Sequence, residues 1–230
     1  MAKPSQLGLT SAYERAYGAV YDAFINSGLD ANKARQSADN TILSQSYLRL
    51  EITLTTASTA YQLNVLNNQN NAGQNQRPTE VRLSQQDSFF ASQMAAYIAL
   101  PNSGTDYSYP LYTFPNPIEF PTGGVALNGL YTLYNGIGSI VINNQKIVPK
   151  FAMSDFLQIP QTQAVAAPPA AVSQFDPSEV VLMQPNINFV GTNQSTIDVT
   201  LPQAMTALDA GTLLVVILKG VLAQNVTVLV

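Results

Sequence analysis

Residues 47–55 read YLRLEITLT, and apolar and polar side chains alternate through the whole stretch. The apolar positions are Leu48, Leu50, Ile52 and Leu54, and the polar positions between and after them are Arg49, Glu51, Thr53 and Thr55. A period of two is typical of a strand with one buried face and one polar face. The stretch therefore predicts a β-strand at the start of a β-rich body.

Further strands are predicted towards the C-terminus. Residues 140–148 indicate a hairpin, because Asn143 and Asn144 tolerate the positive φ of a tight two-residue turn. Pro149 either ends the second strand or places it at an edge. In residues 212–218, a continuous apolar run follows Thr212, which is typical of a strand covered on both faces. We expect about eight to ten strands with long, uneven loops, a pattern that favours a mainly β fold, a single jelly-roll-like β-sandwich.

Other segments give weaker signals. Residues 67–76 are rich in Asn and Gln and predict a mobile loop, whereas 125–134 is strand-like. Residues 101–124 hold five prolines and several aromatic side chains, which predicts a long irregular loop. Residues 88–100 fit either a helix or a strand. A turn at 191–194 is expected to join two strands.

The N-terminal segment has a helical pattern. Ser11 and Glu14 stand at capping-box spacing, Gly28 suits a helix C-terminus, and Asp30 can cap a second helix. One face of the first helix carries Tyr13, Tyr17, Tyr21 and Phe24. Its amphipathic character alone does not say whose surface it covers. It fits a helical hairpin on its own domain and an arm that docks on a neighbouring subunit.

These patterns divide the chain into two parts. Residues 1–46 are predicted to form a short α-helical N-terminal arm, and residues 47–230 the β-sandwich domain. The N-terminus lacks the apolar core of a secretory signal, and the longest apolar run is far shorter than a membrane-spanning helix requires. Contact with a membrane is left open.

Charge is scarce in this chain. Only 10% of the 230 residues are Asp, Glu, Lys or Arg, whereas an ordinary soluble domain carries roughly 25%. The chain instead contains 19 Asn and 19 Gln. Such a surface suits a protein covered by copies of itself, because desolvating a charge is costly; a free acidic domain with a polar surface is the alternative. No Lys/Arg cluster accompanies the net charge of −4, so no direct nucleic-acid contact is expected.

The sequence offers little to catalysis. It contains no His and no Cys, which removes Ser-His-Asp triads, thiolate nucleophiles and His-held zinc. A pair of carboxylates, Asp106 and Glu119, flanks the aromatic loop and would be the candidate pair of a glycoside hydrolase. Solvated loop carboxylates are the competing interpretation. We therefore predict no catalytic residue, no cofactor and no metal site.

Two segments carry a resemblance to a known class. They are LYNGIGSIVINNQKIVPKFAMSDFLQIPQTQ, residues 133–163, and TLLVVILKGVLAQN, residues 212–225. They resemble coat-type virion proteins of phages, particularly phages of Bacteroidetes, and the plan of helical arm, sandwich and apolar last strand is similar to small jelly-roll capsid proteins. The resemblance implies a capsid shell subunit that assembles with copies of itself and with other virion proteins. It also implies synthesis in the host cytoplasm, residence in the virion, and no catalytic residue.

The aromatic side chains of the helical face and of the long loop are the candidate subunit-interface residues. They are Tyr13, Tyr17, Tyr21, Phe24, Tyr107, Tyr109, Tyr112 and Phe114. Two other functions remain open. The chain is alternatively a minor capsid, spike or tail component of a virion, or a carbohydrate-binding adhesin module that stacks sugars on the loop tyrosines.

Overall fold

The computed structural model describes residues 4–26, 28–66, 73–75, 80, 82–102, 107–116, 119–122, 129–158, 180–224 and 226. The structure is 44% strand and 19% helix, and its sheets are antiparallel. This confirms the prediction of a mainly β chain and is consistent with a β-sandwich.

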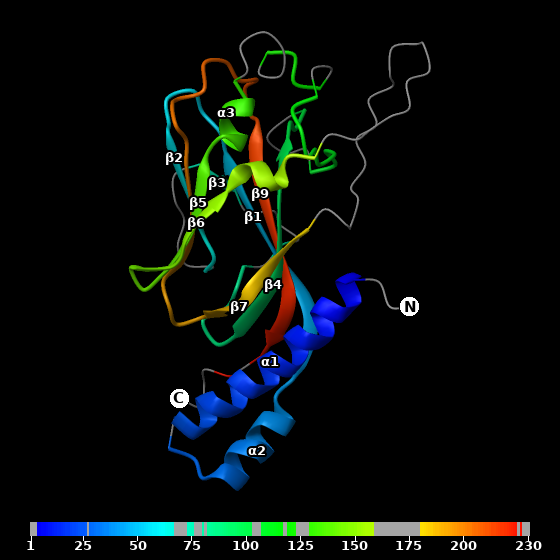
Figure 1. Ribbon diagram of the computed structural model, residues 1–230, viewed down its shortest axis with the longest axis vertical. Coiled ribbons are helices and arrows are strands. Elements are labelled where there is room, and N and C mark those ends of the chain that lie inside the picture. The colour runs from blue at the N-terminus through cyan, green and yellow to red at the C-terminus, as the bar shows by residue number, and fades with distance from the viewer. Residues whose placement is uncertain are drawn as a thin grey trace.

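The strands form two sheets (Figure 1). The larger sheet contains, in spatial order, β3 (Gln74–Asn75), β1 (Leu43–Thr53), β9 (Leu213–Ala223), β4 (Ser88–Ala99) and β7 (Val181–Val190). The smaller sheet contains β2 (Ala60–Asn64), β8 (Ser195–Thr200), β5 (Ile137–Ile142) and β6 (Gln145–Ala152). The first long strand begins at Leu43, slightly before the division predicted at residue 47.

The strands pair in a nested order. Leaving aside the two-residue β3, β1 pairs with β9, β2 with β8, β4 with β7, and β5 with β6. The chain thus runs out and back as one long antiparallel ribbon, folded over into two sheets. The turn at 191–194 does join two strands, but β7 and β8 lie in different sheets and do not form a hairpin.

One apolar core fills the space between the sheets. The alternation of β1 places Leu48, Leu50 and Ile52 in this core. β9 adds Leu214, Val216 and Leu218, and the smaller sheet adds Leu63, Ile140, Ile197 and Val199. Burial of such side chains supplies the main stabilising free energy of a fold. The prediction that 212–218 is covered on both faces is confirmed, because Leu213, Val215 and Ile217 are also buried, on the opposite face.

Two helices precede the sheets. Helix α1 (Pro4–Asn26) starts well before the expected cap at Ser11, and α2 (Ala31–Asn40) follows after a short turn. Gly28 has a φ of 92°, and its N–H donates to the carbonyl of Ile25 at 3.0 Å, which confirms it as the helix terminator. The Asp30 carboxylate accepts hydrogen bonds from the N–H groups of Asn32 and Lys33, both at 3.1 Å, as a capping residue does.

The helical hairpin lies against one end of the larger sheet (Figure 1). Its buried side chains Ala16, Val20 and Phe24 share a cluster with Phe90 of β4 and Val221 of β9. Of the two arrangements left open by the sequence, this chain shows the hairpin on its own sheet. A docking role towards a neighbouring subunit stays a prediction.

The structure also decides the ambiguous segments. Residues 88–100 form strand β4, whose positions are buried on both faces, so its apolar residues do not alternate. The prediction of a strand at 125–134 is wrong where it is described, since Tyr131–Tyr134 forms the short helix α3. The loop predicted at 67–76 includes the strand β3. A 3₁₀ turn, η1, spans Met153–Phe156.

The predicted hairpin of β5 and β6 is confirmed. Asn143 and Asn144 have φ values of 49° and 64°, as a tight primed turn requires. Pro149 lies in β6, the outermost strand of the smaller sheet in the described part of the chain. Residues 161–174, QTQAVAAPPAAVSQ, are of low complexity and predict a connecting segment, and residues 226–230 are predicted to form the last strand. All of 161–174, and 227–230, lie outside the described residues.

Candidate functional site

The outer face of the larger sheet is covered in two places. Because β1 alternates, Tyr47, Arg49 and Glu51 point away from the central core. The helical hairpin covers the end of the sheet that holds Phe90. At the other end, the aromatic loop packs Tyr109 and Leu111 on an apolar patch of β4 and β9. The patch consists of Ala95, Tyr97, Ala99, Leu213, Val215 and Ile217.

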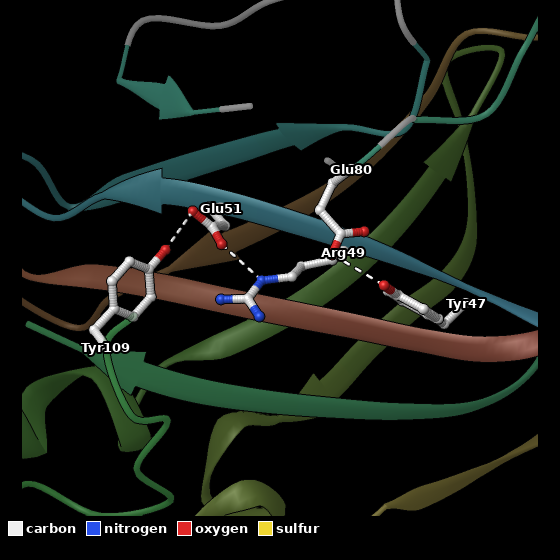
Figure 2. A network of polar contacts seen from close by, with 5 residues as sticks. All are labelled: Tyr47, Arg49, Glu51, Glu80 and Tyr109. Atoms are coloured by element: carbon white, nitrogen blue, oxygen red, sulfur yellow. Dashed lines mark hydrogen bonds and ion pairs between the residues drawn. The ribbon is translucent and has the colours of Figure 1, made fainter. Parts of the chain in front are cut away.

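A buried polar cluster holds this loop on the sheet (Figure 2). The Nε of Arg49 donates to Oε1 of Glu51 at 2.6 Å, and the Tyr109 hydroxyl donates to Oε2 of Glu51 at 2.8 Å. The Arg49 guanidinium also lies 5.8 Å from the centre of the Tyr109 ring, within cation–π range. The side chains of Arg49 and Glu51 are only 11% and 3% exposed. Burying these charges is costly, so the cluster stabilises the loop only as a complete unit.

Next to this cluster the outer face is open. The Tyr47 hydroxyl donates to Oε1 of Glu80 at 3.0 Å, and the Tyr47 ring is half-exposed (Figure 2). A hollow of about 240 Å³ is lined by Gln45, Ser46, Tyr47 and Lys219. Tyr47 and Lys219 face each other across β1 and β9. The hollow therefore crosses the sheet between the helical hairpin and the aromatic loop.

One side of the sandwich is closed by Gln74. Its backbone pairs with Ile52 of β1, in the larger sheet. Its side-chain Nε2 donates to the carbonyl of Asn64 at 2.8 Å, and its Oε1 accepts from the Asn64 N–H at 3.0 Å. Asn64 belongs to β2, in the smaller sheet. The amide of Gln74 thus acts like one more strand residue and ties the two sheets together.

Among the described residues, the opposite side of the sandwich, between β6 and β7, is open and apolar. A cavity of about 220 Å³ enters the core there, lined by side chains that include Met94, Ile140, Val148, Phe151 and Met183. Ile147 of β6 and Leu182 of β7 also line it and are each 50% exposed. The Nδ2 of Asn186, another lining residue, is buried without a hydrogen-bond partner in the described part of the chain. We call this opening, with Ile147 and Leu182 at its mouth, the open edge.

The candidate interface residues of the helix differ in exposure. Tyr13 is 49% exposed, while Phe24 is fully buried in the hairpin's contact with the sheet. Tyr17 and Tyr21 are partly buried at the same cluster. The Tyr17 hydroxyl donates to Oδ1 of Asp39 at 2.6 Å, and this hydrogen bond raises the pKa of Tyr17 above its ordinary value. Phe24 thus serves the fold of the chain itself, and Tyr13 is the member that faces outward.

The candidate residues of the loop are also dispersed. Tyr109 belongs to the buried polar cluster, and Phe114 is partly buried. Tyr112 lies in the central core, where its backbone bridges Ile98. Tyr107 is exposed. The structure therefore does not bring the loop tyrosines together as one flat stacking surface.

Tyr112 lies in surroundings that shift the pKa of its phenol. Its ring meets Phe120 edge-on, with 5.4 Å between the ring centres. Burial, and secondarily the neighbouring Glu119 carboxylate, raises the pKa of Tyr112 to about 12. Asp106, the proposed partner of Glu119 in a carboxylate pair, lies outside the described residues.

Neither metal nor membrane sites emerge from the described residues. Within them, no group of three or more metal-ligating side chains is gathered. No helix among them is long and apolar enough to cross a membrane.

Comparison with known proteins found no match: no family model, no curated protein and no solved structure is similar to this chain.

Sequence reasoning missed two features of the site. Gln74 stood within an Asn/Gln-rich tract that predicted only a loop, and nothing in its sequence marks it as a link between the sheets. The sequence could have indicated the open edge, because in Lys146-Ile147-Val148-Pro149-Lys150 apolar residues lie between two lysines on a predicted edge strand. Its cavity arises only when β7 is placed beside it.

Proposed function

We propose that this chain is a structural subunit of a virus shell, and that it acts by assembling with copies of itself. In this proposal the body is a single jelly-roll β-sandwich, and α1 with α2 forms an N-terminal arm. The arm keeps its Phe24 face on its own sheet and presents Tyr13 to the outside.

The nested strand pairing is the observation that carries the proposal. Leaving aside the two-residue β3, the eight other strands of the described residues lie in two sheets and pair from the outermost pair inward, which supports a jelly roll. Viral capsid domains, lectins and cupins share this architecture. A fold alone does not define a function, so the side chains must separate these classes.

The side chains favour the shell over the other two classes. The chain has no His to hold a catalytic metal in the manner of many metalloenzymes. A lectin-like role would use a stacking platform, but Tyr109 is engaged with Glu51 and Tyr112 is in the core. Low charge and the apolar open edge instead suit a subunit whose sides are covered by neighbours.

Light scattering after size-exclusion chromatography, combined with electron microscopy, tests the proposal. The purified chain should form large, regular particles or defined oligomers as its concentration rises. The number of copies per native particle then separates a shell subunit from a minor capsid, spike or tail component. A chain that stays monomeric at high concentration, and is absent from virions, would contradict the proposal.

A further inference from the structure

The two sides of the sandwich are built differently. Gln74 closes the side between β1 and β2 by hydrogen bonds to both sheets. The side between β6 and β7 has no such tie among the described residues. It exposes the cavity and the half-exposed Ile147 and Leu182 at its mouth. An exposed apolar opening of this kind is typical of a surface that binds a partner, because the partner removes the apolar side chains from water.

The edge strands at this opening resist simple strand addition. The pairing of β5 with β6 shifts register twice, between Gly138 and Ile140 and between Ile140 and Val141. The pairing of β4 with β7 shifts between Ala91 and Gln93. Each edge strand also contains a proline, Pro149 in β6 and Pro185 in β7, which cannot donate to a ladder. Bulges and prolines are devices against edge-to-edge pairing, so a partner must use side chains.

The charged side chains on the two edge strands β6 and β7 have one sign. Lys146 and Lys150 are exposed on β6, on either side of the apolar run that lines the cavity. Neither β6 nor β7 contains an acidic residue. A twofold contact of this edge with itself would oppose lysines to lysines, which is unfavourable. The edge instead fits a surface that combines an exposed apolar side chain with an acidic one.

Such a surface lies at the junction of α2 and β1, at the helical end of the molecule (Figure 1). Ile42 is 63% exposed, more than any other large apolar side chain in the described residues. Asp39, three positions earlier, is also exposed. We name Ile42 with Asp39 the junction knob.

We propose that the open edge binds the junction knob of a second copy of this chain. Ile42 of one copy enters the cavity between β6 and β7 of the next, and Asp39 lies near Lys146 and Lys150. The contact is head-to-tail, so each bound copy leaves a free edge and a free knob for further copies. The inference rests on the proposed self-assembly and names the surface that performs it.

Single substitutions test the two halves of the contact. Leu182→Asn at the edge and Ile42→Asn at the knob should each weaken self-association at least tenfold, as measured by analytical ultracentrifugation. Ile137→Asn is the matched control, because Ile137 is a large exposed side chain outside both surfaces. Circular dichroism should show the same fold in all three variants. Unchanged association of both Leu182→Asn and Ile42→Asn would overturn the inference while leaving self-assembly intact.

A charge-reversal experiment tests the pairing itself. The variant Lys146→Glu/Lys150→Glu and the variant Asp39→Lys should each fail to associate alone, since edge and knob then carry like charges. Mixed together they should assemble, because the unchanged knob of the first fits the unchanged edge of the second. Asp39→Lys also loses the hydrogen bond from the Tyr17 hydroxyl, so its thermal unfolding is measured to check that the variant remains folded.

The outcomes separate this contact from other occupants. A mixture that stays dissociated, although both variants are folded, would overturn the head-to-tail contact. A small molecule that co-purifies in the cavity, detected by native mass spectrometry and lost in Leu182→Asn, would replace the second copy as occupant. A wild-type chain that never associates would remove both this inference and the proposed function.

Discussion

At the scale of single residues, the buried polar cluster under the aromatic loop gives a sharp prediction. Glu51→Gln keeps the shape of the side chain but leaves the largely buried Arg49 without an anionic partner. Removing one partner of a buried ion pair costs about 3–5 kcal/mol, and we expect the free energy of unfolding to fall by about 3 kcal/mol. Urea denaturation measures it. Asp22→Asn, on the exposed side of α1, should change stability by less than about 0.5 kcal/mol.

Two buried tyrosines predict how stability changes in alkaline solution. An ordinary tyrosine has a pKa of about 10, and burial raises the pKa of Tyr112 to about 12 and also raises that of Tyr134. Below pH 10 both phenols are neutral in the folded and unfolded chain. Between pH 10 and 12 only the unfolded chain releases these protons, so the free energy of unfolding must decrease.

Denaturation midpoints at pH 9 and pH 11.5 measure this loss, and Tyr112→Phe or Tyr134→Phe should each remove part of it. An unchanged alkaline loss in the double variant would show that other groups cause it.

At the scale of elements, the two-residue strand β3 is expected to stabilise the fold through its residue Gln74. Gln74→Glu keeps an acceptor for the Asn64 N–H but places an anion against the Asn64 carbonyl. Losing a donor and leaving that carbonyl unmatched costs about 1–3 kcal/mol. We expect unfolding at correspondingly lower urea and faster hydrogen exchange in β2. Asn75→Asp is the control, since the Asn75 side chain makes an exposed hydrogen bond to the Thr53 hydroxyl at 3.2 Å, within the larger sheet. Equal effects of the two substitutions would exclude the tie between sheets.

Elements were predictable where the sequence pattern reflects local physics. Apolar and polar residues alternate in β1 because one of its faces packs on the core. The turn between β5 and β6 could be predicted because its two asparagines tolerate a positive φ. β4 was ambiguous because burial on both faces erases any period. The sequence predicts a strand over the residues of α3, because their apolar side chains suit either a helix or a strand. Helical end signals worked at Gly28 and Asp30, where the backbone itself needs those side chains.

At the scale of the whole molecule, the sequence could indicate a mainly β chain, but it could not indicate the buried polar cluster or the cavity of the open edge. Arg49 and Glu51 occupy the polar positions of β1, which predicts contact with water. They are buried instead, because Tyr109 and its loop return over them. The open edge likewise forms only where β6 and β7, which belong to different sheets, lie side by side. Such long-range contacts decide what is accessible, and no local pattern encodes them.

The helical hairpin allows the fold and the assembly to be tested separately. Phe24 fills the contact between α1 and the sheet, so Phe24→Ala should lower the free energy of unfolding by about 3–5 kcal/mol. Tyr13 is half-exposed on the same helix, so Tyr13→Ala should change the free energy of unfolding by less than about 0.5 kcal/mol.

If the hairpin also acts as an arm towards a neighbouring subunit, Tyr13→Ala will weaken association seen by light scattering without lowering stability. Normal assembly of Tyr13→Ala, together with a destabilised Phe24→Ala, would restrict the aromatic face of α1 to covering its own sheet, because the only measurable contribution of that face would then be internal.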